Sequence, residues 1–435
     1  MSIGKAGLIS CFLLLAGNLW AQEATVSTQT AQLSLEQAET IAITNQPRLL
    51  AEQLRAQASV QRIREAQAAF QPLVTFNATG ALTADTGTAT AAGSLTTSAA
   101  SDRFAYGGNL TQLLTDFGRT HALVHSARSQ SSVRADLVTL TRAQVRLNVR
   151  EAYYSVLGAE AVLTAAQAAL ANRQLVSRQL EALAQSELRS TLDVKFAKVL
   201  ESEAELAVVH AQSMVEQSRS RLATAMGQQQ PIRSRLTRPV LPNSIQYSPE
   251  ELISLALTQR ADLSAAQAQQ KAAQEFAEAE KKLSYPTLNV LGAAGQIPYH
   301  DHTLHDSYAT VGFNLNIPIF NGGLFAARRT EANLEASAKA RDTTALRLEV
   351  NQQARDDWYR VDEAYRSLDV TAKLVAQSKE ALRLAQDRYE AGLGSIVELN
   401  EAQLNETSAE ISAADATYTY LSCRAELDFA AGLLN

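Results

Sequence analysis

Two stretches of this chain are far longer than ordinary helices and almost free of helix-breaking residues. The sequence has neither glycine nor proline from Leu324 to Ala391, and from Arg119 to Leu188 it contains the single glycine Gly158. At a rise of about 1.5 Å per residue, each stretch predicts a helix roughly 100 Å long. Because a compact globular monomer has no use for helices of that length, we expect an elongated bundle.

A second, shorter helix is expected after each long one, beyond a tight turn at residues 187–192 or 392–395. After the second turn, one apolar or aromatic side chain recurs every seven residues, at Val397, Leu404, Ile411 and Tyr418. Seven residues is the period of a coiled coil. The chain is also rich in Ala, Gln, Leu and Glu with only 6% aromatic residues, a composition that suits long helices packed side by side.

An internal repeat divides the chain into two copies of one plan. The segment Leu33-Ser34-Leu35-Glu36 aligns with Tyr247-Ser248-Pro249-Glu250 at an offset of 214 positions. Further on, Asp116-Phe117-Gly118 aligns with Phe320-Asn321-Gly322 at an offset of 204, so ten residues are missing from the second copy between these landmarks. Because the difference in length between the two copies is confined to one place, we expect a loop there.

The repeat and the turn signals predict the domain organisation. We expect a signal peptide at 1–21 and a first repeat at 22–246, with a β-hairpin at 73–117, long helices within 119–227 and a linker at 228–246. The second repeat is expected at 247–435, with a β-hairpin at 287–320 and long helices within 324–434.

The N-terminus has the pattern of a secretory signal peptide. Lys5 precedes an apolar run at 7–17, and the small residue Ala21 marks the expected cleavage point. We expect Cys11 not to be lipidated, because almost no apolar segment precedes it. Cleavage leaves Cys423 alone, so no intrachain disulfide can form. No other segment has about eighteen uncharged apolar residues, so no helix is expected to cross a membrane.

Each hairpin contains two strand candidates, which makes four strands in the chain. In the clearest one, Ala309 to Ile319, apolar residues alternate strictly with Thr, Gly, Asn and Pro, so one face is apolar and the other polar. A sheet of this kind in lipid has to close, because open edges leave backbone groups unpaired. Since barrels have at least about eight strands, one chain is too small, whereas a homotrimer supplies twelve.

Other classes of protein are disfavoured. The net charge of −6 does not suit a nucleic-acid-binding protein, which has a basic face. No phosphate-binding loop, nucleophile elbow or zinc-ligand spacing is present, so we expect no enzyme, cofactor or metal. The alternatives are a periplasmic coiled-coil scaffold or adaptor without a pore, and an exported hydrolase. His121 and His125, and the histidines of the second hairpin tip at 298–306, are expected to be ordinary polar residues.

Several segments together resemble the TolC-like outer-membrane efflux proteins. They are Leu33-Ser34-Leu35-Glu36-Gln37-Ala38, Asn45-Gln46-Pro47-Arg48-Leu49, Asp116-Phe117-Gly118-Arg119, the run from Arg388 to Leu399, and Ala430-Ala431-Gly432-Leu433-Leu434-Asn435. The likeness covers essentially the whole mature chain. It implies a mainly α fold with a small β part: long antiparallel coiled-coil helices and four strands per chain, assembled as a trimeric 12-strand barrel and an α-helical periplasmic tunnel.

The resemblance also implies function, partners and site residues. The chain would be the outer-membrane exit duct of a tripartite efflux or type I secretion system, with a periplasmic adaptor (membrane fusion protein) and an inner-membrane pump or ABC transporter as partners. The implied tunnel constriction is Glu398 and Glu401, and the closed-state link joins Asp193 to Tyr389. The family's second link would fall on Leu192 and Gly394 and is absent. The implied adaptor-docking tip comprises Arg189, Ser190, Thr191, Gly392, Leu393, Gly394 and Ser395.

Overall fold

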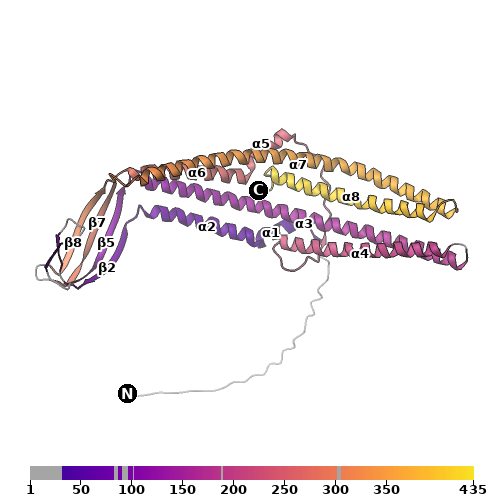
Figure 1. Ribbon diagram of the computed structural model, residues 1–435, viewed down its shortest axis with the longest axis horizontal. Helices are drawn as coiled ribbons and strands as arrows, with labels where there is room; N and C mark the ends of the chain where they lie inside the picture. Colours follow the sequence, from indigo (N-terminus) through magenta and orange to yellow (C-terminus); the bar gives the residue numbers. More distant parts are fainter. Residues whose placement is uncertain (1–31, 83–86, 91–96, 101, 188–189, 301–304) are drawn as a thin grey trace, which may run out of the picture.

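The computed structural model shows a long bundle of helices with a β-sheet at one end and helical turns at the other (Figure 1). It describes residues 32–435 except 83–86, 91–96, 101, 188–189 and 301–304. The predicted signal peptide, Cys11 and Arg189 therefore lie outside the described residues, as do parts of both predicted hairpin tips.

The helices follow the same order in both halves of the chain. In the first half they are α1 Leu35–Asn45, α2 Pro47–Ala68, α3 Arg119–Gln185 and α4 Thr191–Ala225. In the second half they are α5 Pro249–Gln259, α6 Ala261–Lys281, a 3-10 turn at Lys282–Ser284, α7 Leu324–Glu390 and α8 Ile396–Ala430. Helices α3 and α7 each have 67 residues, and α4 and α8 each have 35. The two long helices are thus about 100 Å long, as the sequence predicted.

Local sequence explains where the helices begin and end. Ser34 and Ser248 start α1 and α5 with capping boxes, in which the serine hydroxyl accepts from a backbone N–H three residues on and that residue's side chain accepts from the serine N–H. Pro47 ends α1 and starts α2, because proline lacks an N–H but fits the first helical turn. Gly118 and Gly323 have left-handed backbones, with φ of 87° and 85°, where the chain turns from strand into long helix.

The strands form one main antiparallel sheet in the order β2-β5-β7-β8. Their bounds are β2 Leu73–Ala81, β5 Arg103–Thr115, β7 Thr287–Tyr299 and β8 Ser307–Asn316, with a small hairpin of β3 Gly87–Thr90 and β4 Thr97–Ala100 in the first tip and a parallel pair of β1 Gln32–Leu33 and β6 Arg235–Leu236. The central pair β5–β7 joins the two halves of the chain. A Cβ at Gly295 would lie 2.3 Å from the carbonyl oxygen of Tyr106, so this close approach needs glycine.

Two sequence predictions about the strands can be compared with the sheet. The last strand was expected to reach Ile319, but β8 ends at Asn316, because Pro318 has no N–H for the ladder. The loss of ten residues was expected in a loop, and the second tip is the shorter one, at 300–306 against 82–102 in the first. The apolar side chains of β8 point into open space in the single chain, with Val311 82% and Phe313 79% exposed.

The apolar core lies in the middle of the bundle, where α1 and α5 pack onto the long helices (Figure 1). Its largest fully buried side chains include Tyr153 of α3 and Tyr420 of α8. The Tyr153 hydroxyl donates to the carbonyl oxygens of Leu33 and Thr237, at 2.8 and 2.7 Å. Tyr420 contacts the carbonyls of Pro242 and Asn243 in the same way, at 3.2 and 2.8 Å. The linker at 228–246 therefore lies across both helical hairpins, the α3–α4 coil and the α7–α8 coil, and is attached to each.

One helix is more apolar than the sequence analysis anticipated. Helix α3 contains an 18-residue window with a mean hydropathy of 1.2 and at most two charged residues, so by length and composition it could cross a membrane. Helix α3 contacts α1, α2, α4, α6 and α8 along its length and supplies several residues of the central core. A helix with neighbours on several sides carries apolar residues around more of its surface than an ordinary amphipathic helix.

Candidate functional site

The turn between α7 and α8 is built from local hydrogen bonds. The N–H groups of Leu393 and Gly394 donate to the carbonyl oxygen of Arg388, at 2.9 and 3.0 Å, and so satisfy the end of α7. Gly392 supplies the left-handed residue that this motif needs, with φ of +74°. Ser395 then starts α8, its hydroxyl accepting from the N–H of Glu398 at 3.1 Å. The sequence thus reverses the chain sharply at this position.

The turn between α3 and α4 reverses the chain without glycine. Glu187 has the left-handed backbone that glycine has in the other turn, with φ of 58°. Ser190 starts α4, and its hydroxyl accepts from the N–H of Leu192 at 3.1 Å. The predicted tip residues Ser190 and Thr191 therefore lie at the same end of the molecule as Gly392 to Ser395 (Figure 1). Sequence reasoning placed Glu187 in this turn but did not predict its left-handed backbone, since residues other than glycine rarely adopt this conformation.

The two predicted constriction carboxylates, Glu398 and Glu401, lie in the first two turns of α8 and are both exposed. Glu398 forms an ion pair: the guanidinium of Arg388, on the other side of the turn, lies 3.2 Å from its carboxylate. Arg388 also donates to the carbonyl oxygen of Leu393 at 3.4 Å. Sequence reasoning treated Arg388 only as part of a motif. Its distance of ten positions from Glu398 across a tight turn was the available signal.

The residues of the predicted closed-state link lie at this same end. Asp193 is in the first turn of α4 and Tyr389 in the last turn of α7, and both are half-buried. Asp193 benefits from its position at a helix N-terminus, where the helix dipole favours a negative charge. The link between the two side chains stays a prediction.

The predicted seven-residue stripe on α8 is only partly covered within one chain. Val397 and Leu404 are 69% and 55% exposed, whereas the buried positions of α8 near the turn are Leu399 and Gln403. Exposed apolar residues also follow α4 at Leu192, Phe196, Val199, Leu206 and Val209. Within one chain the end of this stripe near the turn faces open space, whereas Tyr418 at its other end packs against the central core.

A buried arginine connects the two coils above the turns. Arg173 of α3 is only 7% exposed, and its guanidinium donates to the side-chain oxygen of Asn400 at 2.7 Å and to the Asn400 carbonyl at 3.5 Å. Asn400 lies between Glu398 and Glu401 in α8, so Arg173 holds the segment that carries both carboxylates. Sequence reasoning missed this contact, because it joins positions 227 residues apart.

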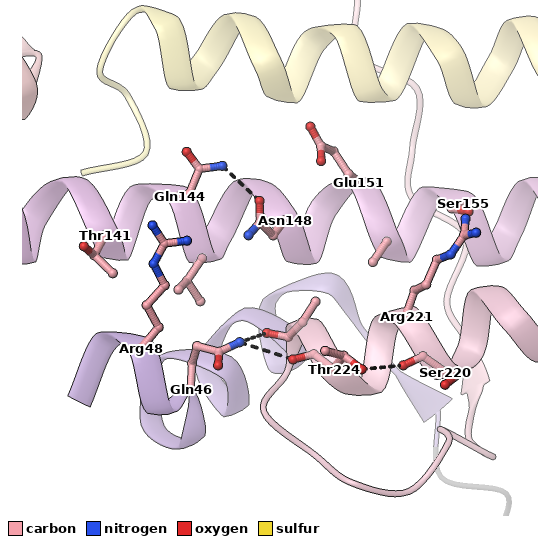
Figure 2. A pocket seen from close by; sticks show the side chains of 13 residues that line it. Gln46, Arg48, Thr141, Gln144, Asn148, Glu151, Ser155, Ser220, Arg221 and Thr224 are labelled. Carbon is pink, nitrogen blue, oxygen red and sulfur yellow. Dashed lines mark hydrogen bonds between the residues drawn. The ribbon is translucent and has the colours of Figure 1, made fainter. Parts of the chain in front are cut away.

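An open pocket of 620 Å³ lies where the start of α2 meets α3 and the end of α4 (Figure 2). Its lining is mostly polar: Gln46 donates to the carbonyl oxygens of Thr224 and Ala225, and Gln144 donates to Asn148. Glu151 lies on the α8 side of α3 in Figure 2, and burial together with the nearby Glu426 raises its pKa. The residues that line this pocket include serine and threonine but no histidine.

The histidines singled out in the sequence have ordinary surroundings where they are described. His121 packs against Phe70 with ring centroids 4.8 Å apart. His300 lies 2.9 Å from the carboxylate of Asp306. Within the described part of the chain no group of three His, Cys, Asp or Glu side chains could hold a metal ion. His302 lies outside the described residues.

The comparisons with known proteins agree with this geometry. The family model described as "Outer membrane efflux protein" matches residues 40–228 and 252–433. The chain is 22% identical over 342 residues to the outer membrane protein TolC of Salmonella enteritidis, a match that covers 75% of this chain and 68% of that protein. A shorter match, 24% identical over 152 residues, covers 35% of this chain and 30% of TolC from Escherichia coli K12.

Solved structures share the fold. The outer-membrane channel OprN is 21% identical with a TM-score of 0.79, over 92% of this chain and 89% of that one. CusC has a TM-score of 0.80 at 17% identity, covering 92% of both chains. The Neisseria gonorrhoeae MtrE channel, in an open state, has a TM-score of 0.76 at 21% identity, over 92% and 88%. The chain is an outer-membrane protein with a large periplasmic portion, and it belongs to the TolC-like family of outer membrane efflux proteins.

Proposed function

We propose that three copies of this chain form the exit duct of a tripartite efflux or type I secretion system. The observation that carries the proposal is the four-stranded sheet, which is open at β2 and β8 and exposes the apolar residues of β8. Twelve strands from three chains would close this sheet into a barrel, with the apolar face toward lipid and the polar face toward water. The exposed stripes of α4 and α8 would be covered by the neighbouring copies.

The proposed duct runs through the helices as well as the barrel. The two halves, 22–246 and 247–435, would be structural repeats that each supply a hairpin and a pair of long helices. Because the helices extend about 100 Å from the sheet, their turns would lie deep in the periplasm. There the tip would dock a periplasmic adaptor, and through it an inner-membrane pump or ABC transporter.

At the tip, Glu398 and Glu401 from three chains would line the constriction. A ring of carboxylates attracts cations, as in other channels. The contact with Arg388 compensates part of this charge, so the ring is less acidic than six free carboxylates. Tyr389 and Asp193 would hold neighbouring coils together in the closed state.

Electrical recording tests the duct directly. Purified protein inserted into planar lipid bilayers should give discrete, cation-selective conductance steps that multivalent cations block from the side exposing the helical turns. Protein that inserts but gives no conductance would contradict a duct. A periplasmic scaffold, the competing function, would instead be released by osmotic shock without detergent.

Docking can be tested at one residue. Leu393 is 75% exposed at the tip, and Val240 is 92% exposed in the linker near the middle of the bundle. A photoreactive amino acid at position 393 should crosslink a periplasmic adaptor in cells, whereas the same group at position 240 serves as the matched control. Equal capture at both positions, or none at 393, would contradict docking through the tip.

A further inference from the structure

The packing of the bundle changes between its middle and its tip. In the middle, the core clusters contain large apolar residues from α3, α4, α7 and α8. Toward the tip, the buried residues of the same helices are mostly small or polar: Ala166, Arg173, Ser177, Leu180, Ala197, Ser378, Ala385, Leu399, Gln403 and Ala409. Since small residues bury little apolar area, the coils are held together much less strongly there.

In this weakly packed region the described ion pairs join helices within one coil. Lys198 of α4 pairs with Glu181 of α3, and Lys379 of α7 pairs with Glu410 of α8, so each stabilises its own helical hairpin. The contact from Arg173 to Asn400 runs between the coils, from α3 to α8. It therefore resists separation of one coil from the other, which the pairs within a coil do not.

The positive charge of the buried Arg173 guanidinium is also poorly compensated. Its partner is a neutral amide, and burial lowers the pKa of the guanidinium, with Glu203 opposing this only from a distance. A buried charge without an opposite charge is unfavourable unless hydrogen bonds replace its water. One turn further along α8, the side-chain oxygen of Gln403 is buried without a hydrogen-bond partner among the described residues. Exposure to water would satisfy both groups, so separation of the coils restores hydration at this position.

We propose that the Arg173–Asn400 contact is a latch that holds the first turns of α8 against α3, and that its release lets the tip widen. The latch would set the position of Glu398 and Glu401, because Asn400 lies between them. The inference rests on the proposed exit duct for its role in transport, although the contact itself can be tested without conductance.

The test is amide hydrogen exchange of the purified, detergent-solubilised protein, measured for the segment 396–403. Asn400→Ala leaves the guanidinium buried without its partner, so exchange there should be about tenfold faster. Asn400→Asp supplies an opposite charge, so exchange should become slower than in the unmodified chain. Arg178→Met is the matched control, because Arg178 is exposed on the same helix and, among the described residues, donates to the Gln174 carbonyl of its own helix; it should have no effect.

The Asp variant keeps the test decisive if Asn400→Ala fails to assemble, because it adds an attraction instead of removing one. With Arg173→Met in the background, Asn400→Asp should reverse its effect and speed exchange, since its carboxylate would then be buried without a cation. Unchanged exchange in both Asn400 variants, or the same sign for Asn400→Asp with and without Arg173, would overturn the latch.

Conductance gives the functional outcome. In planar bilayers Asn400→Ala should raise the open probability about tenfold and Asn400→Asp should lower it, with Arg178→Met unchanged. If exchange responds as expected but the unmodified chain conducts no ions, the latch stands and the proposed duct fails. If the chain conducts but neither Asn400 variant alters gating or exchange, the duct stands and the latch fails.

Discussion

Tyr153→Phe should loosen the middle of the molecule at one defined place. The Tyr153 side chain is fully buried, and burial raises the pKa of its hydroxyl. The hydroxyl donates to two carbonyl oxygens that belong to distant segments, at Leu33 and Thr237. The variant removes this donor but keeps the ring, so the change in free energy comes from the lost hydrogen bond.

The size of the effect follows from the geometry. Losing a buried hydrogen bond and leaving its acceptors unsatisfied costs about 1–3 kcal/mol, and about 1.4 kcal/mol is a factor of ten in an equilibrium constant. The β1–β6 pair next to it has only two residues per strand, and the Thr237 N–H that donates to the Leu33 carbonyl at 3.1 Å is its neighbour. We therefore expect this pair to open at least about tenfold more often.

Hydrogen exchange measures this opening. Peptides covering Leu33 and Thr237 should exchange about tenfold faster in Tyr153→Phe, whereas the adjacent α3 segment 143–157 should not change. Tyr154→Phe is the matched control, because Tyr154 is also buried, at 6% exposed, but its hydroxyl makes none of the hydrogen bonds found among the described residues. Unchanged exchange at Thr237, or an equal effect of the control, would refute this account of the linker.

Four further predictions follow from particular contacts. Gly392→Val forces a β-branched residue into a left-handed backbone at a strain of about 1–2 kcal/mol, so export should be lost while detergent-extracted trimers persist; normal export would show that this turn is not the docking tip. Glu398→Gln with Glu401→Gln should relieve block by multivalent cations, whereas Arg388→Met should strengthen the block. Arg388→Met should change the stability by less than about 1 kcal/mol, because the Arg388–Glu398 pair is about half exposed. A stronger block in the double glutamine variant and a weaker one in Arg388→Met would place these residues outside the tunnel. Tyr389→Phe should raise the resting conductance if its hydroxyl holds Asp193, and unchanged conductance would remove that link. Burial and Glu426 raise the pKa of Glu151, so folding favours its protonated form. Glu151→Gln should therefore stabilise the protein above that raised pKa and lose this advantage as the pH falls from the raised pKa to the usual 4.5. A gain that grows toward acid would contradict the assignment.

The sequence predicted the elements that depend on local patterns. The absence of glycine and proline predicted α7, and strict alternation predicted β8 apart from its end. Each of these signals comes from neighbouring residues, so one chain is enough to interpret it.

Contacts between distant segments could not be predicted in this way. The period at Val397 and Leu404 was correct as a pattern, but a period does not state which helix covers it. The Arg173–Asn400 contact and the attachment of the linker by Tyr153 join segments 227 and 84 residues apart, and their residue types are common on exposed helix faces. Glu187 shows a different limit, because its left-handed backbone is imposed by the reversal between two helices and has no signature in the sequence.

The central claim is that three chains close one barrel and one tunnel. Multi-angle light scattering of the purified protein in mild detergent, corrected for bound detergent, tests it most directly. We expect a protein mass of three chains, together with the circular dichroism of a protein rich in helix with a small β part. A mass of one chain with that spectrum retained would contradict the claim, because the open edges of β2 and β8 would then have no partner strands.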